Sequence, residues 1–401
     1  MTKELARRIA FTIGALLLFL LGTHIPVTGM WTSNGPLPQG AVARLSVFSL
    51  GLIPYLSAAI VIRLLSVVWR GLSALERSGE HGRGRIARYT LLLTLAFAAF
   101  QAYGIASAIQ RIPEIAVDAD GWFSVSAAAS IVGGVFFLIW LSEQITRHGV
   151  GNGLALILSV GILVDLPSDV AGIVDLVQRG AVSGNLVLGH VIFWVAAVAL
   201  IVFVESARRH VRIEFSERKV GERMLPARAA VLPIKINSAG FLIPTTVAPW
   251  VFFLPLSFAA FIYGARTPWI EAAYLHLGVG RPAHLILISV AVFVLAFLYT
   301  AFVVDPEHAA DSLAKHGAVI PGVAPGEPTA DYLDRVVSLT TVVGAVYLTV
   351  LQSIPEAFVA SGNALPYNMS GGAALIVICT VLDLQTQVRD LSLTDPGGER
   401  Q

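Results

Sequence analysis

The chain has 401 residues, of which 56% are hydrophobic and only 13% are charged, with a mean hydropathy of +0.75 and a formal net charge of +1. Soluble globular proteins are usually about a quarter charged, so this composition excludes a water-soluble globular protein and predicts an integral membrane protein. The single cysteine, Cys379, excludes an intramolecular disulfide, and we expect it to be a small buried side chain.

Apolar segments recur along the whole chain. A membrane-spanning helix needs about 20 apolar residues, and helix is the only open-chain structure that satisfies its own backbone in hydrocarbon. The first segment follows Lys3, Arg7 and Arg8 but lacks a small-residue cleavage pattern, so we expect a retained span rather than a signal peptide. The ten predicted spans lie near residues 9–26, 45–68, 88–109, 125–145, 151–168, 186–205, 236–262, 284–304, 333–354 and 368–388.

The distribution of lysine and arginine predicts the orientation of these spans. Cytoplasmic segments of membrane proteins carry an excess of both residues. Placing the N-terminus in the cytoplasm puts 22 of the 27 lysines and arginines on the cytoplasmic side, and an error of one span would scramble this division. We therefore expect both termini in the cytoplasm, with five arginines on the other side: Arg44, Arg111, Arg179, Arg266 and Arg281.

Three connections between the predicted spans differ in character. The cytoplasmic segment 206–235 is long and basic, which suits either a projecting stalk or simple anchoring against anionic lipid. The cytoplasmic segment 305–332 is also long, has little apolar content and contains four prolines. The segment 27–44 on the far side is rich in glycine and proline, so we do not expect a long helix there.

Prolines interrupt two of the predicted spans at corresponding places. Pro54 removes a backbone donor from span two, and Pro244 and Pro249 do the same in span seven, so we expect both helices to be broken. Matched breaks in two sets of five spans suggest inverted repeats around a midplane pathway. A proline kink is also common in membrane helices without any function.

Motifs for enzymatic chemistry or ion coupling do not occur in the predicted spans. The charged residues there are few and lie mostly near span ends, as do Glu143, Glu205 and Asp383, so they form no proton relay. No Walker loop or His-Glu-x-x-His sequence occurs, and the glycines of 149–153 do not fit the dinucleotide fingerprint. We predict no catalytic residues, no metal site, no cofactor and no enzymatic activity.

Six stretches, in order over essentially the whole chain, resemble the SecY family, the channel subunits of the Sec protein translocase. The stretches are Arg44–Ala58, Gly79–Thr90, Glu143–Gly153, Leu232–Gly240, Pro321–Glu327 and Leu365–Tyr367. The resemblance implies an all-α integral membrane fold of ten transmembrane helices in two pseudo-symmetric five-helix halves that open like a clamshell. We place these halves at 1–168 and 169–401, with the cytoplasmic loops 206–235 and 305–332 in the second.

The resemblance also implies a pore constriction, a ring of bulky apolar side chains from spans two, five, seven and ten. Such a ring excludes water and ions yet yields around a passing chain without binding it. Unfolded secretory polypeptides would cross through it, and apolar segments would leave sideways into the bacterial inner membrane. The matching positions are Leu56, Ile60, Leu158, Ile162, Thr246 and Ile376.

The partners implied by the resemblance are SecE-like and SecG-like small membrane subunits, the SecA ATPase or a ribosome as driver, unfolded preproteins and the lipid bilayer. We expect no direct contact with nucleic acid. The motor or ribosome would dock on the two cytoplasmic loops, at Arg208, Arg209, Arg218, Lys219, Ala324, Pro325, Gly326 and Glu327.

Three departures from the family pattern indicate a divergent or accessory member. The segment 27–44 is short for a plug helix, a polar Thr246 stands at a ring position, and Ala324 replaces the arginine that precedes Pro-Gly-Glu in the family. Two alternatives remain open. A secondary transporter of a small solute predicts a compact polar midplane site, and a non-conducting SecY-like assembly factor would follow from the lost plug and arginine.

Overall fold

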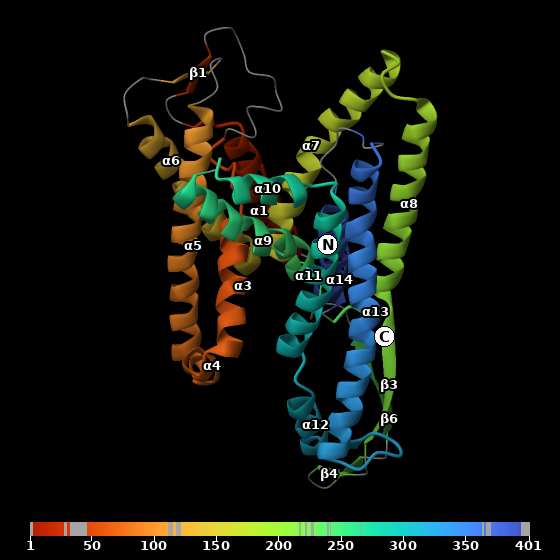
Figure 1. Ribbon diagram of the computed structural model, residues 1–401. Coiled ribbons are helices and arrows are strands. Elements are labelled where there is room, and N and C mark those ends of the chain that lie inside the picture. The colour runs from red at the N-terminus through yellow and green to blue at the C-terminus, as the bar shows by residue number, and fades with distance from the viewer. Residues whose placement is uncertain are drawn as a thin grey trace. The chain divides into compact units, whose positions relative to one another are not determined.

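The computed structural model is mainly helical (Figure 1). In the part of the chain that it describes, a helix of 16 residues or more lies at each of the ten predicted spans. Among the described residues, eight helices are long and apolar enough to cross a membrane, so the prediction of a multi-pass membrane protein is confirmed. The described residues are 3–27, 30–32, 46–110, 115–117, 122–215, 218–220, 223–225, 228–238, 240, 242–264, 266–362, 365 and 370–393.

Long helices and short connecting elements alternate along the chain. The long helices are α1 (Lys3–Thr23), α3 (Ile53–Val68), α5 (Glu80–Ile109), α6 (Phe123–His148), α7 (Gly153–Gln178), α8 (Gly184–Ser206), α9 (Leu242–Tyr263), α11 (Pro282–Val303), α13 (Glu327–Ala360) and α14 (Gly371–Leu393). The shorter helices are α4 (Arg70–Arg77), α10 (Pro268–His276) and α12 (Pro306–Lys315). The strands are β1 (Met30–Thr32), β2 (Ile115–Val117), β3 (Arg208–Phe215), β4 (Arg218–Val220), β5 (Arg223–Leu225), β6 (Arg228–Lys235) and β7 (Ala318–Val319).

The chain divides into two compact units. Unit 1 comprises residues 1–175 and 380–401, and unit 2 comprises residues 176–379. Helices α7 and α14 each begin in one unit and end in the other. The predicted halves at 1–168 and 169–401 stay a prediction.

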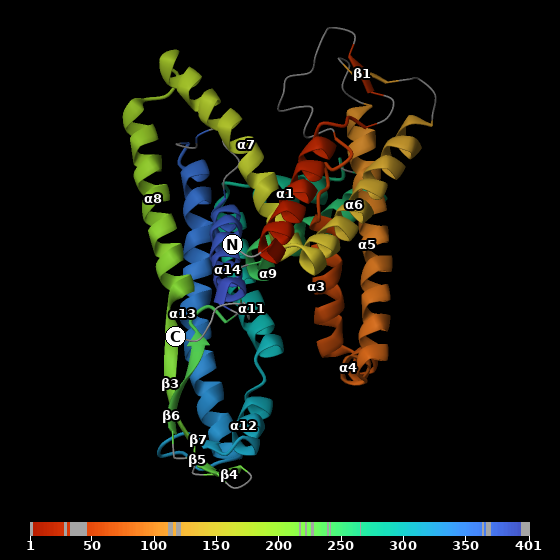
Figure 2. The ribbon, with the colours of Figure 1, turned by 180° about the vertical axis from the view of Figure 1, so that it is seen from behind.

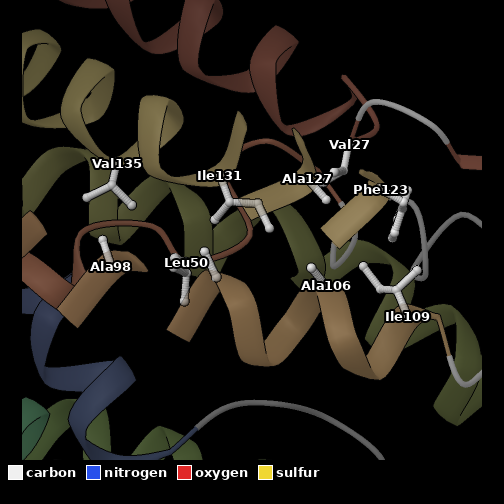
Figure 3. Packing of buried hydrophobic residues seen from close by; sticks show 10 residues of the cluster. Val27, Leu50, Ala98, Ala106, Ile109, Phe123, Ala127, Ile131 and Val135 are labelled. Atoms are coloured by element: carbon white, nitrogen blue, oxygen red, sulfur yellow. The ribbon is translucent and has the colours of Figure 1, made fainter. Parts of the chain in front are cut away.

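The core of unit 1 lies where α5 packs along α6 (Figure 3). Ala98, Ala102 and Ala106 recur at every fourth position of α5 and therefore lie on one face. Ile131 and Val135 of α6 fill the space that these small side chains leave. Small residues let membrane helices approach closely, where dispersion contacts replace the hydrophobic effect that lipid does not supply.

The predicted interruption at Pro54 is present in unit 1. Residues 47–52 form turns, and α3 begins only at Ile53, so Pro54 lies in its first turn. A proline is tolerated there because the first backbone N–H groups of a helix have no partner within it. The turn is held to the segment that follows α1 by a bridge between Pro26 and Ser46 and by a hydrogen bond of 3.0 Å from the Val47 N–H to the Ile25 carbonyl.

The predicted break in span seven is wrong. Helix α9 continues from Leu242 to Tyr263 across both Pro244 and Pro249. Pro244 lies in the first turn, where it removes no helical hydrogen bond, and membrane helices tolerate an internal proline such as Pro249 when neighbours satisfy the freed carbonyl. The prediction of inverted repeats therefore keeps the support of the interruption in unit 1 only.

In unit 2, β3 and β6 form a long antiparallel hairpin that continues from the end of α8 (Figure 2). The strand β7 pairs with β3 and brings the second long connection, 305–332, against the first, 206–235. We call β3, β6, β7, α12 and the first three turns of α13 the hairpin subdomain. Its apolar core is formed by Val211, Ile213, Ile320 and Leu333, with α12 contributing Ala309 and Leu313. The segment 305–332 was expected to have little apolar content, yet its few apolar side chains, among them Ile320 and Leu313, contribute to this core.

Candidate functional site

Two pairs of predicted ring residues lie in unit 1. Leu56 and Ile60 are one turn apart on α3, and their exposed fractions are 5% and 4%. Leu158 and Ile162 are one turn apart on α7, and both are half-buried. Side chains four positions apart share one face of a helix, so each helix presents its two apolar side chains as a pair.

The remaining ring positions belong to unit 2. Ile376 is buried in α14 with an exposed fraction of 7%. Thr246 lies in the first half of α9, and its side chain is outside the described part of the structure. The ring of six residues therefore stays a prediction.

The glycine-rich stretch between α6 and α7 positions α7. The Val150 N–H donates to Thr12 Oγ1 of α1 at 2.9 Å, and the Gly151 N–H donates to Gln387 Oε1 of α14 at 2.7 Å. Gly151 has a φ of +90°, a conformation that glycine adopts without strain. A Cβ on Gly153 would lie 2.0 Å from the Ser142 carbonyl oxygen, so only glycine fits there. This turn anchors α7 to two other helices of unit 1.

A buried hydroxyl pair holds α7 next to Leu158. The hydroxyl of Ser159 donates to that of Thr380 on α14 at 2.9 Å, and both side chains are buried. Buried polar groups in a membrane protein are satisfied by such contacts between helices. The sequence analysis missed this contact, since a serine and a threonine in apolar segments give no signal of their pairing.

In unit 2, the start of α14 is held against α13 by backbone contact. A Cβ on Gly371 would lie 1.9 Å from the Leu351 carbonyl oxygen, so the two backbones touch at this glycine. The Gly372 N–H donates to Gln352 Oε1 at 3.0 Å and so satisfies a free N–H group of the first turn. The position of Ile376 on α14 depends on these contacts.

A buried histidine and glutamate join α11 to α13. His284 Nδ1 and Glu356 Oε1 are hydrogen-bonded, and the Gly280 N–H also donates to this carboxylate oxygen at 3.3 Å. Both side chains are buried, with exposed fractions of 5% and 8%. The sequence analysis missed the pair because Glu356 lies two residues beyond the predicted end of span nine, and nothing in the pattern connects it to His284.

The predicted docking residues of β3 and β4 have different environments. The Arg208 guanidinium Nη1 donates to the Glu205 carbonyl at 2.6 Å and to the Ala207 carbonyl at 3.2 Å. Arg208 therefore satisfies carbonyl groups at the end of α8, as cations commonly do at helix C-termini. Arg209, the next residue, is exposed. Arg218 and Lys219 lie on β4, and their side chains are outside the description.

The predicted docking residues before α13 form an exposed tip. Gly322 and Gly326 have φ values of +81° and +94°, which let the chain turn twice before α13 starts at Glu327. Ala324 and Pro325 are exposed. The Thr329 hydroxyl of α13 donates to the Ala324 carbonyl at 2.8 Å and so fixes the tip to the helix.

Sequence comparisons connect this arrangement to known proteins. The SecY family model matches residues 46–385. The protein translocase subunit SecY of Escherichia coli K12 is 35% identical over 98% of this chain and 92% of its own. The protein translocase subunit SecY of Vibrio cholerae is 34% identical over 96% of this chain and 91% of its own.

Solved structures share the fold at lower identity. A SecY protein studied for the plug domain that stabilises its closed state has a TM-score of 0.73 and 17% identity, over 98% of this chain and 94% of its own. A protein-conducting channel has a TM-score of 0.68 with the same identity and coverage. These likenesses confirm the predicted fold class of ten transmembrane helices in two halves. From the family match and the curated relatives, we conclude that the chain belongs to the SecY family.

Proposed function

We propose that this chain is the channel subunit of a bacterial protein translocase. The observation that carries the proposal is the 35% identity to the translocase subunit SecY of Escherichia coli over 98% of the chain. Unfolded secretory polypeptides cross the membrane through the channel, and sufficiently apolar segments leave it sideways. A channel subunit performs no bond chemistry, so membership in this family also fits the prediction that the chain is not an enzyme.

The ring residues seal the resting channel and let an unfolded polypeptide pass through it. The side chains of Leu56, Ile60, Leu158, Ile162 and Ile376 are aliphatic and offer no hydrogen bond to a passing chain. An apolar constriction of this kind dewets and blocks ions at rest. Segments that leave sideways are sorted by partitioning, because each Leu, Ile, Phe or Val favours lipid by roughly 0.3–0.6 kcal/mol and a central charge opposes by about 2.5–3.5 kcal/mol.

The channel lies in the bacterial inner membrane with both termini in the cytoplasm. The excess of lysine and arginine on the proposed cytoplasmic side supports this orientation. The hairpin subdomain then faces the cytoplasm and presents Arg209 and the tip at Ala324–Glu327 to a driver. The driver is SecA or a ribosome. Two structural neighbours support the ribosome: Sec61 in a canine ribosome–channel complex and a yeast Ssh1 complex bound to the 80S ribosome.

SecE-like and SecG-like subunits complete the proposed complex. The large apolar side chains exposed along α8, among them Leu188, Ile192, Val195 and Phe203, leave room for lipid or a small membrane subunit. A small-solute transporter is the weaker alternative. It needs a compact polar site at the midplane, whereas the His284–Glu356 pair lies near the first turn of α11 and the last turns of α13.

Site-specific photocrosslinking tests the proposed path. A photoreactive side chain replaces Ile60 or Ile162 in the full-length chain, and a translocating preprotein is stalled in membranes from a SecY-depleted bacterium. Both positions should crosslink to the stalled preprotein, because a ring touches the chain that it admits. Ile192 of α8 is the matched control, since it is also an isoleucine of a membrane helix but is 61% exposed.

The outcomes separate the proposed channel from its alternatives. Crosslinks at Ile60 and Ile162, without one at Ile192, support a channel with this ring. Equal crosslinking at all three positions would assign contact with the preprotein to the surface rather than to a pore. No crosslink at any position, together with no rescue of the depleted strain, would favour the non-conducting assembly factor.

A further inference from the structure

The chain passes from the hairpin subdomain into α9 through a buried residue, Asn237. Strand β6 ends at Lys235, and α9, which carries the predicted ring position Thr246, starts at Leu242. Asn237 lies between these two elements and is only 3% exposed. A buried amide group costs free energy unless it is hydrogen-bonded, so the contacts of Asn237 decide how firmly the hairpin subdomain is joined to α9.

One half of the Asn237 amide is bound to the end of α8. The Asn237 Nδ2–H donates to Glu205 Oε1 at 2.7 Å. The backbone follows the same path, because the Ile236 N–H donates to the Ala207 carbonyl at 3.5 Å. A hydrogen bond to a carboxylate is stronger than one between neutral groups. A movement of the hairpin subdomain is therefore felt both at the end of α8 and at the residue that leads into α9.

The other half of the Asn237 amide faces α13. A Cβ on Gly344 would lie 3.2 Å from Asn237 Cα and 3.4 Å from Asn237 Oδ1, so the link touches α13 at this glycine. Asn237 Oδ1 is buried and accepts no hydrogen bond from the residues that the structure describes. Since a buried acceptor without a donor costs free energy, a donor that reached Oδ1 would stabilise the link.

Tyr347 of α13 carries such a donor. It lies three positions after Gly344 on the same face of the helix, and helical side chains lean toward the N-terminus, which here is toward Gly344. Tyr347 is 7% exposed, and within the described part of the chain its hydroxyl has no hydrogen-bond partner. The hydroxyl also interacts electrostatically with Glu205, the present partner of Asn237. An unpaired donor and an unpaired acceptor thus lie at one helix contact.

We propose that Asn237 is a positioning residue that exchanges Glu205 for Tyr347 and so couples the hairpin subdomain to α9. The inference rests on the proposed function. In the resting channel, Nδ2 donates to Glu205. When a driver moves the hairpin subdomain, the link shifts along α13 and the Tyr347 hydroxyl donates to Asn237 Oδ1, which holds α9 in its displaced position while a preprotein passes. Two discrete arrangements of one side chain transmit a movement that a flexible link would absorb.

Tyr347→Phe separates this role from a structural one. Loss of an unpaired buried hydroxyl should leave the resting protein at least as stable as the wild type in thermal unfolding. Loss of the donor should nevertheless slow translocation by about five- to tenfold, the effect of one net hydrogen bond. The rate is the appearance of protease-protected preprotein in inverted membrane vesicles of a SecY-depleted bacterium that carry the variant, supplied with SecA and ATP.

Thr349→Val is the matched control for Tyr347→Phe. It also removes an unpaired buried hydroxyl from α13, as far as the structure describes its surroundings, but from a residue that does not contact Asn237. Its stability should change in the same direction as that of Tyr347→Phe, and its translocation rate should equal that of the wild type.

An exchange of the first pair tests the resting arrangement. Asn237→Asp places two carboxylates side by side and should slow translocation by about tenfold. Adding Glu205→Gln to the same chain restores one donor and one acceptor with their roles reversed, and it leaves an oxygen at position 237 for Tyr347. The double variant should therefore recover most of the lost rate. The affinity of SecA for the vesicles should stay unchanged in every variant, because Asn237 is buried.

The outcomes distinguish this inference from the proposed function. Wild-type vesicles that translocate no preprotein would refute the proposed channel. Active wild-type vesicles with an equally fast Tyr347→Phe variant would refute the exchange of partners alone. A parallel loss of stability and rate in Tyr347→Phe would reduce the tyrosine to a structural role. Weaker binding of SecA in Asn237→Asp would place the defect in docking rather than in coupling.

Discussion

At the scale of single residues, Gly134 of α6 is the point of closest approach between that helix and the turn before α3. A Cβ there would lie 2.2 Å from the Val47 carbonyl oxygen, whereas one on the neighbouring Gly133 would meet nothing within 4 Å. We predict that Gly134→Ala destabilises the protein by about 1–3 kcal/mol, because backbone must move to admit the methyl group. Gly133→Ala is the matched control and should stabilise the helix by up to about 1 kcal/mol.

Thermal unfolding in detergent, followed by circular dichroism, compares the two glycine variants. The expected order of stability is Gly133→Ala, wild type, Gly134→Ala. If both substitutions had the same effect, α6 would not approach Val47 in the way described.

The His284–Glu356 pair is a second residue-scale feature with a measurable contribution. His284→Ala should destabilise unit 2 by about 1–3 kcal/mol, because it leaves a buried carboxyl group without its main partner. Replacing both residues by leucine should recover most of this loss, since apolar side chains need no hydrogen-bond partner. His276→Ala, at an exposed position of α10, is the control.

Urea unfolding in mixed micelles measures this second set of variants. A double variant that is less stable than His284→Ala would show that the carboxyl group has another essential partner. A large effect of His276→Ala would instead point to a general sensitivity to the loss of histidine.

At the scale of elements, the hairpin subdomain joins two connections that lie far apart in the sequence. Val211 of β3 is buried in its core, while Val231 of β6 is 54% exposed. Val211→Asp should therefore open the subdomain, since a carboxylate in that core lacks a partner. Val231→Asp, the same change on the opposite face of the hairpin, should leave it closed.

Limited trypsin digestion tests the hairpin prediction, because the strands carry several arginines. Cleavage within 208–235 should be at least tenfold faster in Val211→Asp than in wild type or Val231→Asp. If Val231→Asp were cleaved as fast, the two faces of the hairpin would be equivalent and the apolar core irrelevant.

Elements differ in how well the sequence predicts them, for physical reasons. The ten spans were predictable because hydrocarbon requires long apolar helices, and Pro54 correctly marked the late start of α3. Pro244 and Pro249 were misleading, since a proline in the first turn removes no helical hydrogen bond and α9 continues through Pro249. The hairpin was missed because the apolar residues of β3 are interleaved with charged ones in a segment that charge marks as a loop, and because β7 pairs with β3 only after a hundred intervening residues.

The candidate site shows the same division between local and long-range information. The glycines of 149–153 stand out in the sequence, but the sequence does not show why glycine is needed there. The close contact of Gly153 with the Ser142 carbonyl exists only in the folded protein. The partners of Thr380 and Glu356 are more than 70 residues away in the chain. Family resemblance located Leu56 and Ile60, whereas composition alone identifies any leucine or isoleucine in a span only as apolar.

At the scale of the whole molecule, the placement of positive charge organises the chain. The hairpin subdomain, the start of α1 and the end of α6 all carry lysines or arginines, and all fall on the side that we assign to the cytoplasm. The proposed drivers require this side, because they act from the cytoplasm. The proposed docking of a driver and the direction of transport therefore both depend on the orientation.

The last prediction tests this orientation with single cysteines in a Cys379→Ala background. Ala314 lies on α12 in the predicted cytoplasmic connection, and Ala181 lies between α7 and α8 on the predicted far side; both are exposed. Ala314→Cys should react with a membrane-impermeant maleimide only after the cells are opened, whereas Ala181→Cys should react in cells with a permeable outer membrane. The physical reason is that moving the arginine-rich connections across the membrane costs more than moving the five arginines of the other side. Labelling of both cysteines from the same side would contradict the ten-span topology, and labelling with the sides exchanged would place the hairpin subdomain out of reach of SecA and ribosomes.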